Sequence, residues 1–176
     1  MARQPELMNN LLELFAPIRT FVFDVDGVLT DGNLILTEDG HMLRSMNIKD
    51  GYALQLAVKK GYNVWIISGG KSEAVKLRLN KLGITQVHIG VESKKELLHE
   101  ITTSSNLGYE SILYMGDDIP DYAAMQQCGL PCCPNDAVTE IRQVAKYISP
   151  YNGGKGCVRD VIEKVLKLNG DWQLPA

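Results

Sequence analysis

Acidic residues in this chain gather where short apolar runs end. Asp24 ends the run T-F-V-F-D and Asp26 follows it, while Asp117, Asp118 and Asp121 come directly after S-I-L-Y-M. Carboxylates brought into one small volume raise each other's pKa strongly unless a cation lies between them. Oxygen ligands with no His or Cys nearby favour Mg²⁺, which binds a few carboxylates together with water and a substrate phosphate. The pattern therefore predicts a Mg²⁺ site.

Two further polar positions follow other apolar runs. Ser68 and Gly69 come after N-V-W-I-I and precede a predicted helix over 71 to 82, where a hydroxyl, N–H groups and the helix dipole favour an anion. Lys94 comes after the run at 86 to 89 and offers a fixed positive charge. The alternatives are ordinary ones: Ser68 as part of a helix N-cap region, Lys94 as a solvated surface lysine, and some of the acids as helix caps.

The elements that must position these residues alternate along the chain. Short unalternating runs predict buried strands at 20 to 24, 63 to 67, 86 to 89, 111 to 115 and 129 to 133. Helical spacing of apolar residues predicts helices over 50 to 60, 71 to 82, 94 to 105, 119 to 127, 136 to 145 and 156 to 168. This alternation predicts an α/β fold with a doubly wound, mostly parallel sheet, whose ligands gather at the carboxyl ends of the strands.

Three segments stand outside the alternation. Residues 31 to 48 contain two β-like arms around Glu38-Asp39-Gly40, and Asp-Gly favours a hairpin turn, so we predict a projecting β-hairpin. An extension over 1 to 17 carries a predicted amphipathic helix at 6 to 15, and 150 to 176 form a C-terminal helix and tail. We expect one domain over 1 to 176.

Composition excludes several classes of protein. The chain has 176 residues, 45% hydrophobic and 22% charged, which excludes a disordered chain. Eighteen Lys and Arg against twenty-one Asp and Glu give a net charge of -3, so nucleic acid is not an expected partner. No membrane-spanning run or signal sequence is apparent, which predicts a cytoplasmic protein without a membrane partner. The cysteines show no metal-binding spacing and are expected to be reduced.

Taken together, these motifs resemble those of the haloacid dehalogenase superfamily of phosphotransferases. The chain presents D-V-D-G-V, a serine after the second strand, Lys94 and G-D-D-I-P-D in that order. The resemblance implies Asp24 as the nucleophile that forms an aspartyl-phosphate, and Asp26 as general acid and then base. It further implies that Ser68 binds phosphoryl oxygens and that Lys94 balances charge. Mg²⁺ would be held by Asp24, the Asp26 carbonyl and Asp117, with Asp118 acting through water or by orienting its neighbours and Asp121 supporting the group.

Other segments narrow the resemblance within the superfamily. The stretches D-G-V-L-T-D-G, N-I-K-D-G-Y and G-G-K-G-C-V-R-D resemble the phosphatases of 3-deoxy-D-manno-octulosonate 8-phosphate, from Phe21 to Leu168. This implies a phosphorylated sugar acid as the substrate and a step in lipopolysaccharide precursor synthesis. The expected substrate-side residues are Asn47, Lys49, Asp50, Gly51, Gly69, Gly70 and Arg78. Gly70 and Gln55 stand where many relatives carry Arg. Phosphatases of nine-carbon keto-sugar phosphates, which often carry an acidic residue at the position of Gly70, remain the alternative.

The segment between Thr30 and Asp50 has room for a hairpin and none for a separate cap domain. Resemblance to the capless subgroup implies a homotetramer in which hairpins pack together and a neighbour's tail closes the pocket. Two rivals from other classes remain. A receiver-like signalling domain also combines acids, Mg²⁺, a hydroxyl and a lysine, but its motif order differs. An inactive phosphatase-like module is opposed by the complete acidic set.

Overall fold

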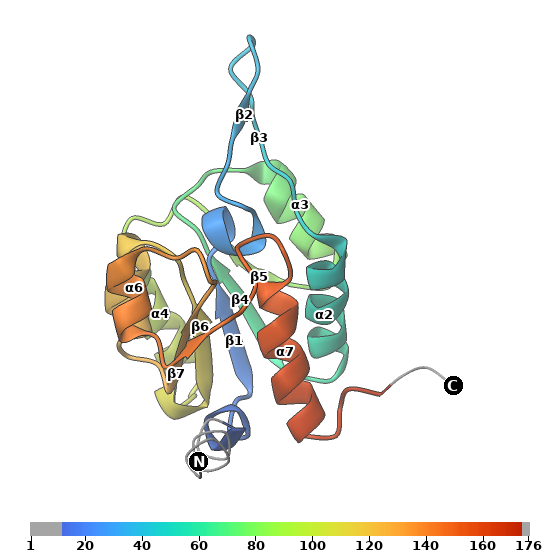
Figure 1. The fold of residues 1–176 in the computed structure, drawn as a ribbon, viewed down its shortest axis with the longest axis vertical. Helices are drawn as coiled ribbons and strands as arrows, with labels where there is room; N and C mark the ends of the chain where they lie inside the picture. The colour runs from blue at the N-terminus through green and yellow to red at the C-terminus, as the bar shows by residue number, and fades with distance from the viewer. Residues whose placement is uncertain (1–11, 174–176) are drawn as a thin grey trace, which may run out of the picture.

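The computed structural model describes residues 12–173 and contains the predicted parallel sheet (Figure 1). Its strands are β1 (Thr20–Phe23), β4 (Asn63–Ile67), β5 (Gln86–His88), β6 (Ile112–Met115), β7 (Leu130–Cys133) and β8 (Tyr147–Ile148). The order is β5-β4-β1-β6-β7-β8, and every neighbouring pair is parallel. All residues of β1, β6 and β7 are buried, because helices cover both faces of the sheet.

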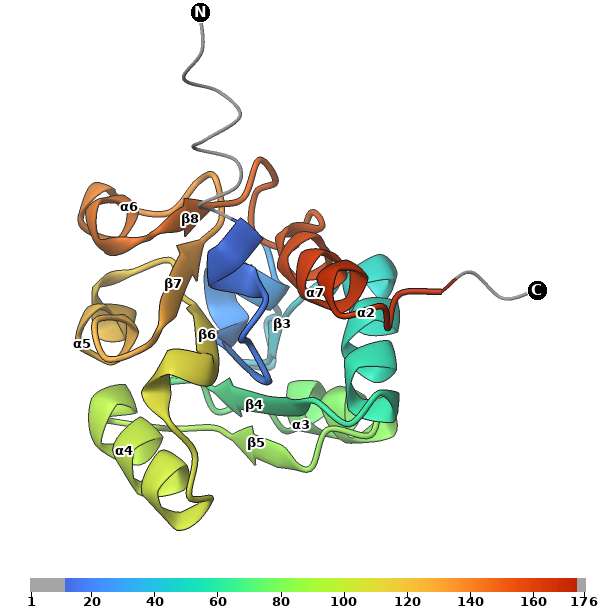
Figure 2. The same cartoon turned by 90° about the horizontal axis from the view of Figure 1, so that it is seen from below.

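The helices lie in two layers, one on each face of the sheet (Figure 2). One layer contains α2 (Ile48–Lys59), α3 (Glu73–Lys81) and α7 (Cys157–Leu168), and the other contains α4 (Lys94–Ser104), α5 (Tyr122–Met125) and α6 (Thr139–Val144). The helix predicted over 119 to 127 is shorter than expected. It is a single turn over Ile119–Asp121, with a proline at its start, followed by α5.

A β-hairpin projects from the body of the molecule, as predicted (Figure 1). Its strands β2 (Ile35–Leu36) and β3 (Met42–Leu43) pair antiparallel, and Gly40 turns the chain with φ 86°. The predicted boundary at residue 48 was wrong. Asn47 accepts a hydrogen bond from the Lys49 backbone N–H at 2.8 Å and thereby caps α2, so the helix begins at Ile48.

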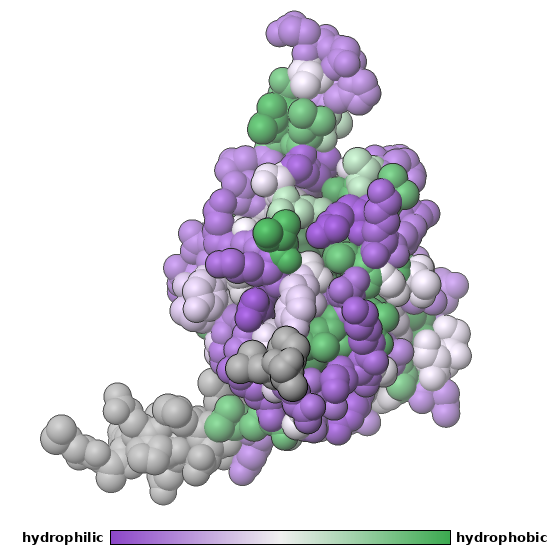
Figure 3. Space-filling model, turned by 90° about the vertical axis from the view of Figure 1, so that its right-hand side faces the viewer, coloured by the Kyte–Doolittle hydropathy of each residue, from purple (hydrophilic) through white to green (hydrophobic). Residues whose placement is uncertain are grey.

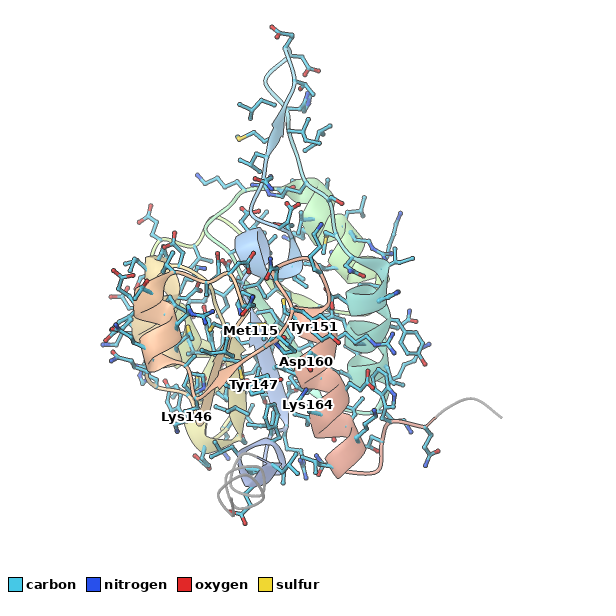
Figure 4. All side chains as sticks on the ribbon, in the orientation of Figure 1. Met115, Lys146, Tyr147, Tyr151, Asp160 and Lys164 are labelled. Atoms are coloured by element: carbon cyan, nitrogen blue, oxygen red, sulfur yellow. The ribbon has the colours of Figure 1, made fainter. Side chains whose placement is uncertain are left out.

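The short edge strand β8 was not predicted, because two residues carry no periodic pattern. Asp160 on α7 accepts hydrogen bonds from Tyr147 Oη at 2.7 Å and Ser149 Oγ at 2.9 Å. Lys164 pairs with the same carboxylate, and Figure 4 shows Tyr147, Asp160 and Lys164 close together where α7 passes β8. The strand is therefore held by side-chain contacts to α7 as well as by its pairing with β7.

Three further expectations concern the cysteines, the N-terminal helix and membrane-spanning segments. The cysteines Cys128, Cys132, Cys133 and Cys157 are all buried, where partly buried thiols were expected, and none of them forms a disulfide. The predicted helix over 6 to 15 lies mostly outside the described residues, although 12–15 are helical. In the described part of the chain, no helix has the length and apolar character needed to cross a bilayer.

Candidate active site

The carboxyl ends of the central strands form a cavity of about 310 Å³. The sheet order places the segments that follow β1, β4 and β6 side by side at this edge. The cavity contains every residue that the sequence predicts to be catalytic or metal-binding. Its lining residues are Asp24, Asp26, Gly32, Ser68, Gly69, Gly70, Lys94, Asp117, Asp118, Pro120 and Asp121.

Asp24 follows β1 directly and is 7% exposed. It caps no helix with its side chain, and its backbone N–H donates to Met115 O on β6 at 3.1 Å. Burial and the neighbouring Asp121 raise the pKa of Asp24 to about 6, while the ammonium of Lys94, 2.8 Å from Oδ1, works against this rise. Asp24 is thus a buried carboxyl group that is paired with one cation.

Both carboxylate oxygens of Asp121 make polar contacts within the protein. Its Oδ1 lies 2.8 Å from Lys94 Nζ and accepts a hydrogen bond from Tyr114 Oη at 2.9 Å. Its Oδ2 accepts from the backbone N–H of Asp117 at 3.3 Å. The side chain is fully buried, so these contacts fix Lys94 between Asp121 and Asp24. This arrangement fits the supporting role expected for Asp121.

Asp117 is held against the turn that leaves β1. A Cβ on Gly27 would lie 1.9 Å from Asp117 Oδ2, so only glycine allows this approach, and Gly27 has φ 90°. The other oxygen, Oδ1, is buried and has no hydrogen-bond partner. Burial, followed by the charges of Asp24 and Asp121, raises the pKa of Asp117 to about 8.

This arrangement fits a divalent cation. Carboxylate oxygens of Asp24, Asp117 and Asp121 all lie within 4.8 Å of one another. A cation would supply the partner that Asp117 Oδ1 lacks and would offset repulsion that a single lysine leaves uncompensated. Both oxygens of Asp121 accept hydrogen bonds, whereas Asp24 pairs with Lys94 through Oδ1 and Asp117 Oδ1 has no partner, so Asp24 and Asp117 are the better candidates to bind the metal. An all-oxygen donor set favours Mg²⁺ over metals that prefer His or Cys.

Asp26 and Asp118 stand apart from that group of three. Asp118 lines the cavity, but its Oδ1 accepts a hydrogen bond from the Ile119 N–H at 2.8 Å and caps the following turn. Asp26 lies on the turn after β1 and pairs with Arg44, whose Nε is 2.6 Å from Oδ1 and whose Nη2 is 3.1 Å from Oδ2. Sequence reasoning missed Arg44, because a lone arginine beside a hairpin carries no pattern.

Ser68 and the two glycines after it form a part of the cavity wall that lies beside Asp26. Ser68 is buried, and its Oγ accepts a hydrogen bond from the Gly70 N–H at 3.1 Å. The helix expected to begin at 71 begins at Glu73, and Ser72 rather than Ser68 caps it. A Cβ on Gly70 would lie 3.0 Å from Asp26 Oδ2 and 3.2 Å from Arg44 Nη2. Gly70 therefore leaves space for the Asp26–Arg44 pair.

The other expected substrate-side residues do not line this cavity. Asn47 and Lys49 line a separate cavity of about 530 Å³ that extends along α7. Arg78 lines a groove of about 390 Å³ between the hairpin and α3, which Arg44 also lines. Gly51 faces Arg78, whose Nη2 would lie 3.1 Å from a Cβ at position 51. Asp50 is 1% exposed and accepts a hydrogen bond from the Arg159 N–H at 2.8 Å.

Comparison with known proteins identifies close matches along almost the whole chain. A scan against protein-family models finds no match. The 3-deoxy-D-manno-octulosonate 8-phosphate phosphatase KdsC of Yersinia pestis is 32% identical over 166 residues, which cover 92% of this chain and 89% of the relative. The KdsC protein of Escherichia coli (strain K12) is 33% identical over 153 residues, covering 87% of this chain and 81% of the relative.

Solved structures agree with these sequence matches. The 3-deoxy-D-manno-octulosonate 8-phosphate phosphatase of Moraxella catarrhalis, in complex with a magnesium ion, a phosphate ion and a KDO molecule, matches with a TM-score of 0.88 and 32% identity, covering 92% of each chain. A structure from Legionella pneumophila, described as a hydrolase of the HAD superfamily (subfamily III A), matches with a TM-score of 0.93 and 32% identity, covering 97% of this chain and 93% of the other.

Proposed function

Because this chain belongs to the KdsC-like phosphatases of subfamily IIIA of the haloacid dehalogenase superfamily, we propose that it hydrolyses 3-deoxy-D-manno-octulosonate 8-phosphate to the free sugar acid and phosphate. The observation that carries this proposal is the cavity in which Asp24 and Lys94 lie together with Asp117, whose buried Oδ1 has no hydrogen-bond partner. The reaction would serve lipopolysaccharide precursor synthesis in a cytoplasmic setting.

In the first half of the proposed reaction, Asp24 attacks the phosphorus atom. The bond between phosphorus and the sugar oxygen breaks, and an aspartyl-phosphate forms on Asp24. Asp26 donates a proton to the departing sugar oxygen. Lys94 fixes the attacking carboxylate 2.8 Å away, and Ser68 with the neighbouring backbone binds phosphoryl oxygens.

In the second half, water displaces the phosphate from Asp24. Asp26, now ionised, takes a proton from the water as it attacks phosphorus, and the Asp24 carboxylate is regenerated. Asp24, Asp117 and the Asp26 carbonyl would hold Mg²⁺, which when bound would neutralise phosphoryl charge. Asp118 orients its neighbours around the metal, and Asp121 keeps Lys94 in place through their 2.8 Å contact.

The substrate's sugar-acid end is proposed to extend from the cavity toward the hairpin groove, with Arg78 as the contact for its carboxylate. Gly51 leaves space beside that guanidinium, and Gly69 and Gly70 leave space at the cavity wall. Asn47, Lys49 and Asp50 were expected on the substrate side as well. Their position around the start of α7 favours an indirect role instead.

We further propose a homotetramer assembled through the hairpins. The four residues of strands β2 and β3, namely Ile35, Leu36, Met42 and Leu43, are large, apolar and exposed. The space-filling view shows an apolar band below a polar hairpin tip (Figure 3). An exposed patch of this kind marks an interaction surface, and identical hairpins can cover one another.

A phosphate-release panel tests the proposed substrate. The purified chain is assayed, with and without Mg²⁺, on the eight-carbon sugar-acid phosphate, on a nine-carbon keto-sugar acid 9-phosphate and on para-nitrophenyl phosphate. The highest kcat/KM is expected on the eight-carbon compound, with loss of activity in a chelator. Preference for the nine-carbon compound would overturn the substrate, and absence of any hydrolysis would favour an inactive phosphatase-like module.

A further inference from the structure

The loop over 152–156, which we call the glycine loop, lies against the turn over 25–31 that leaves β1. The Gly154 N–H donates to Val28 O at 2.9 Å, and Cys157 Sγ lies 3.3 Å from the same oxygen. These contacts join the start of α7 to the segment that carries Asp26. Because the loop and the turn belong to the same chain, this contact exists within one protomer.

Two glycines allow this close approach. A Cβ on Gly153 would lie 2.0 Å from Gly27 O, and one on Gly154 would lie 2.7 Å from the Asp31 N atom. Gly154 also has φ 65°, a conformation that other residues adopt with strain. The two backbones therefore touch directly, with no side chain between them to absorb a displacement.

Side chains from other elements fasten the glycine loop on its outer side. Asn47 uses both ends of its amide: Nδ2 donates to Gly154 O at 3.3 Å, and Oδ1 accepts from the Lys49 N–H at 2.8 Å. Asp136 Oδ1 accepts a hydrogen bond from the Gly153 N–H at 2.9 Å. The loop is thus held from the start of α2 and from the segment after β7.

Asp50 fastens the first turn of α7, directly after the loop. Gly156, at the N-cap of α7, has no side chain that could cap the helix. The carboxylate of Asp50 on α2 replaces such a cap, since its Oδ1 accepts from the Arg159 N–H at 2.8 Å. With 1% of the residue exposed, Asp50 is closed off from any substrate in the cavity.

We propose that the glycine loop positions the turn after β1, and that Asn47 and Asp50 are positioning residues for catalysis rather than substrate contacts. The turn carries Asp26 and also sets the place of Asp117, because Gly27 fits against Asp117 Oδ2. A displacement of the turn would therefore move the acid–base group and a metal-binding carboxylate together. This inference rests on the proposed function in so far as Asp26 acts as the acid and base.

The test uses two substitutions in the full chain and one matched control. Asn47→Asp keeps an oxygen that caps α2 and removes the N–H that binds Gly154 O. Gly154→Ala adds a methyl group that clashes with the backbone of the turn over 25–31. Gly61→Ala is the control, because Gly61 has a similar φ of 85° and a Cβ there would have nothing within 4 Å. Truncation is unsuitable, since α7 supplies buried core residues.

Hydrogen exchange read by mass spectrometry reports on the peptide 24–31, and steady-state kinetics on para-nitrophenyl phosphate reports on turnover. We expect faster exchange in 24–31 and an approximately tenfold lower kcat with unchanged KM for Asn47→Asp and Gly154→Ala, because small misplacements of catalytic groups cost this much or more. Gly61→Ala should match the unsubstituted protein in both measurements.

Unchanged exchange in 24–31 for both substitutions would overturn the inference, as would faster exchange with unchanged kcat. A decrease in kcat shared by Gly61→Ala would also overturn it, because the effect would then follow from backbone strain alone. The exchange measurement needs no substrate. Failure of the sugar-acid substrate in the phosphate-release panel would therefore leave this test intact.

Discussion

Arg44 and Asp26 form a two-point ion pair that connects the projecting hairpin to the catalytic turn. The distances are 2.6 Å from Nε to Oδ1 and 3.1 Å from Nη2 to Oδ2. The Arg44 side chain is 9% exposed, against 36% for Asp26, so the pair is shielded from solvent on the arginine side. A planar donor pair of this kind fixes the plane of a carboxylate as well as its place.

Removal of this pair should impair catalysis more than folding. Arg44→Met keeps much of the length of the side chain and loses the donors, so Asp26 should lose its fixed orientation and kcat should fall about tenfold. Arg44→Lys keeps the charge and loses the two-point geometry, so its kcat should lie between those of the unsubstituted protein and Arg44→Met. Steady-state kinetics with a thermal melt as the control decides the matter; wild-type kcat in Arg44→Met would contradict this role.

Replacement of the nucleophile should abolish turnover and leave the fold intact. Asp24→Asn keeps the volume of the side chain, and Lys94 retains its 2.8 Å contact with Asp121. We expect no measurable phosphate release and no phospho-enzyme after mixing with substrate, because the amide is not a nucleophile. Unchanged far-UV circular dichroism serves as the control for folding. Near-normal phosphate release would rule out Asp24 as the attacking group.

Metal binding should depend on the carboxylate of Asp117. Asp117→Asn should weaken Mg²⁺ binding, and its activity should partly recover at high Mg²⁺. Isothermal titration calorimetry measures the affinity directly, and a Mg²⁺ titration of phosphate release measures the recovery. A variant whose activity does not vary with Mg²⁺ concentration would contradict the role of this residue.

Mg²⁺ binding should strengthen as the pH rises. The pKa of Asp117 is raised by burial and neighbouring acids to about 8, so in the metal-free protein this group carries a proton at pH 7 that Mg²⁺ must displace. Between pH 6.5 and pH 8.5 the apparent Kd should fall, with proton uptake by the buffer visible in calorimetry. An apparent Kd that rises with pH would contradict this linkage.

The raised pKa of Asp117 should also make the metal-free protein less stable as the pH rises. A raised pKa in the folded state gives stability that is complete below the ordinary value of 3.8 and is lost as the pH rises through about 8. The Tm of chelated protein should therefore fall from pH 6.5 to pH 8.5. Asp117→Asn should show a smaller fall over this range, which thermal melts in chelator measure.

Assembly should depend on the exposed side of the hairpin. Leu36 is 72% exposed, so Leu36→Glu should leave the folded protomer stable and disrupt contacts between protomers. Light scattering should report a tetramer for the intact chain and a smaller species for Leu36→Glu. Leu168→Glu, at the exposed end of α7, is the control. A tetramer that persists in Leu36→Glu would exclude the hairpin as the assembly surface.

The strands, the acidic residues that follow them and the hairpin could be predicted from the sequence, because each depends on a local pattern of residues. The strand at 63 to 67 matches β4 residue for residue, because a five-residue, mostly apolar run rich in β-branched and aromatic residues is too short for a typical helix and favours a strand. The acids after β1 and β6 were brought together as expected, because parallel strands point their carboxyl ends to one edge. The Asp-Gly turn also identified the hairpin correctly.

The parts that were missed depend on contacts between distant segments. Arg44 reaches Asp26 across 18 positions of sequence, and Asp50 caps a helix that lies 109 positions away. Neither side chain carries a local signal of its partner. The contact of the glycine loop with the turn after β1 was likewise not expected, and closure of a neighbour's pocket by the tail over 150 to 176 stays a prediction. Such relationships follow from tertiary packing, which no window of residues contains.

The ends of the main sheet also limit how copies of the chain can associate. The outer strands β5 and β8 contain three and two residues, so each sheet edge offers few unpaired backbone groups. Open-ended polymerisation by strand addition requires a longer edge as a template. The chain can thus display an apolar hairpin for closed association while its sheet edges resist the growth of fibrils.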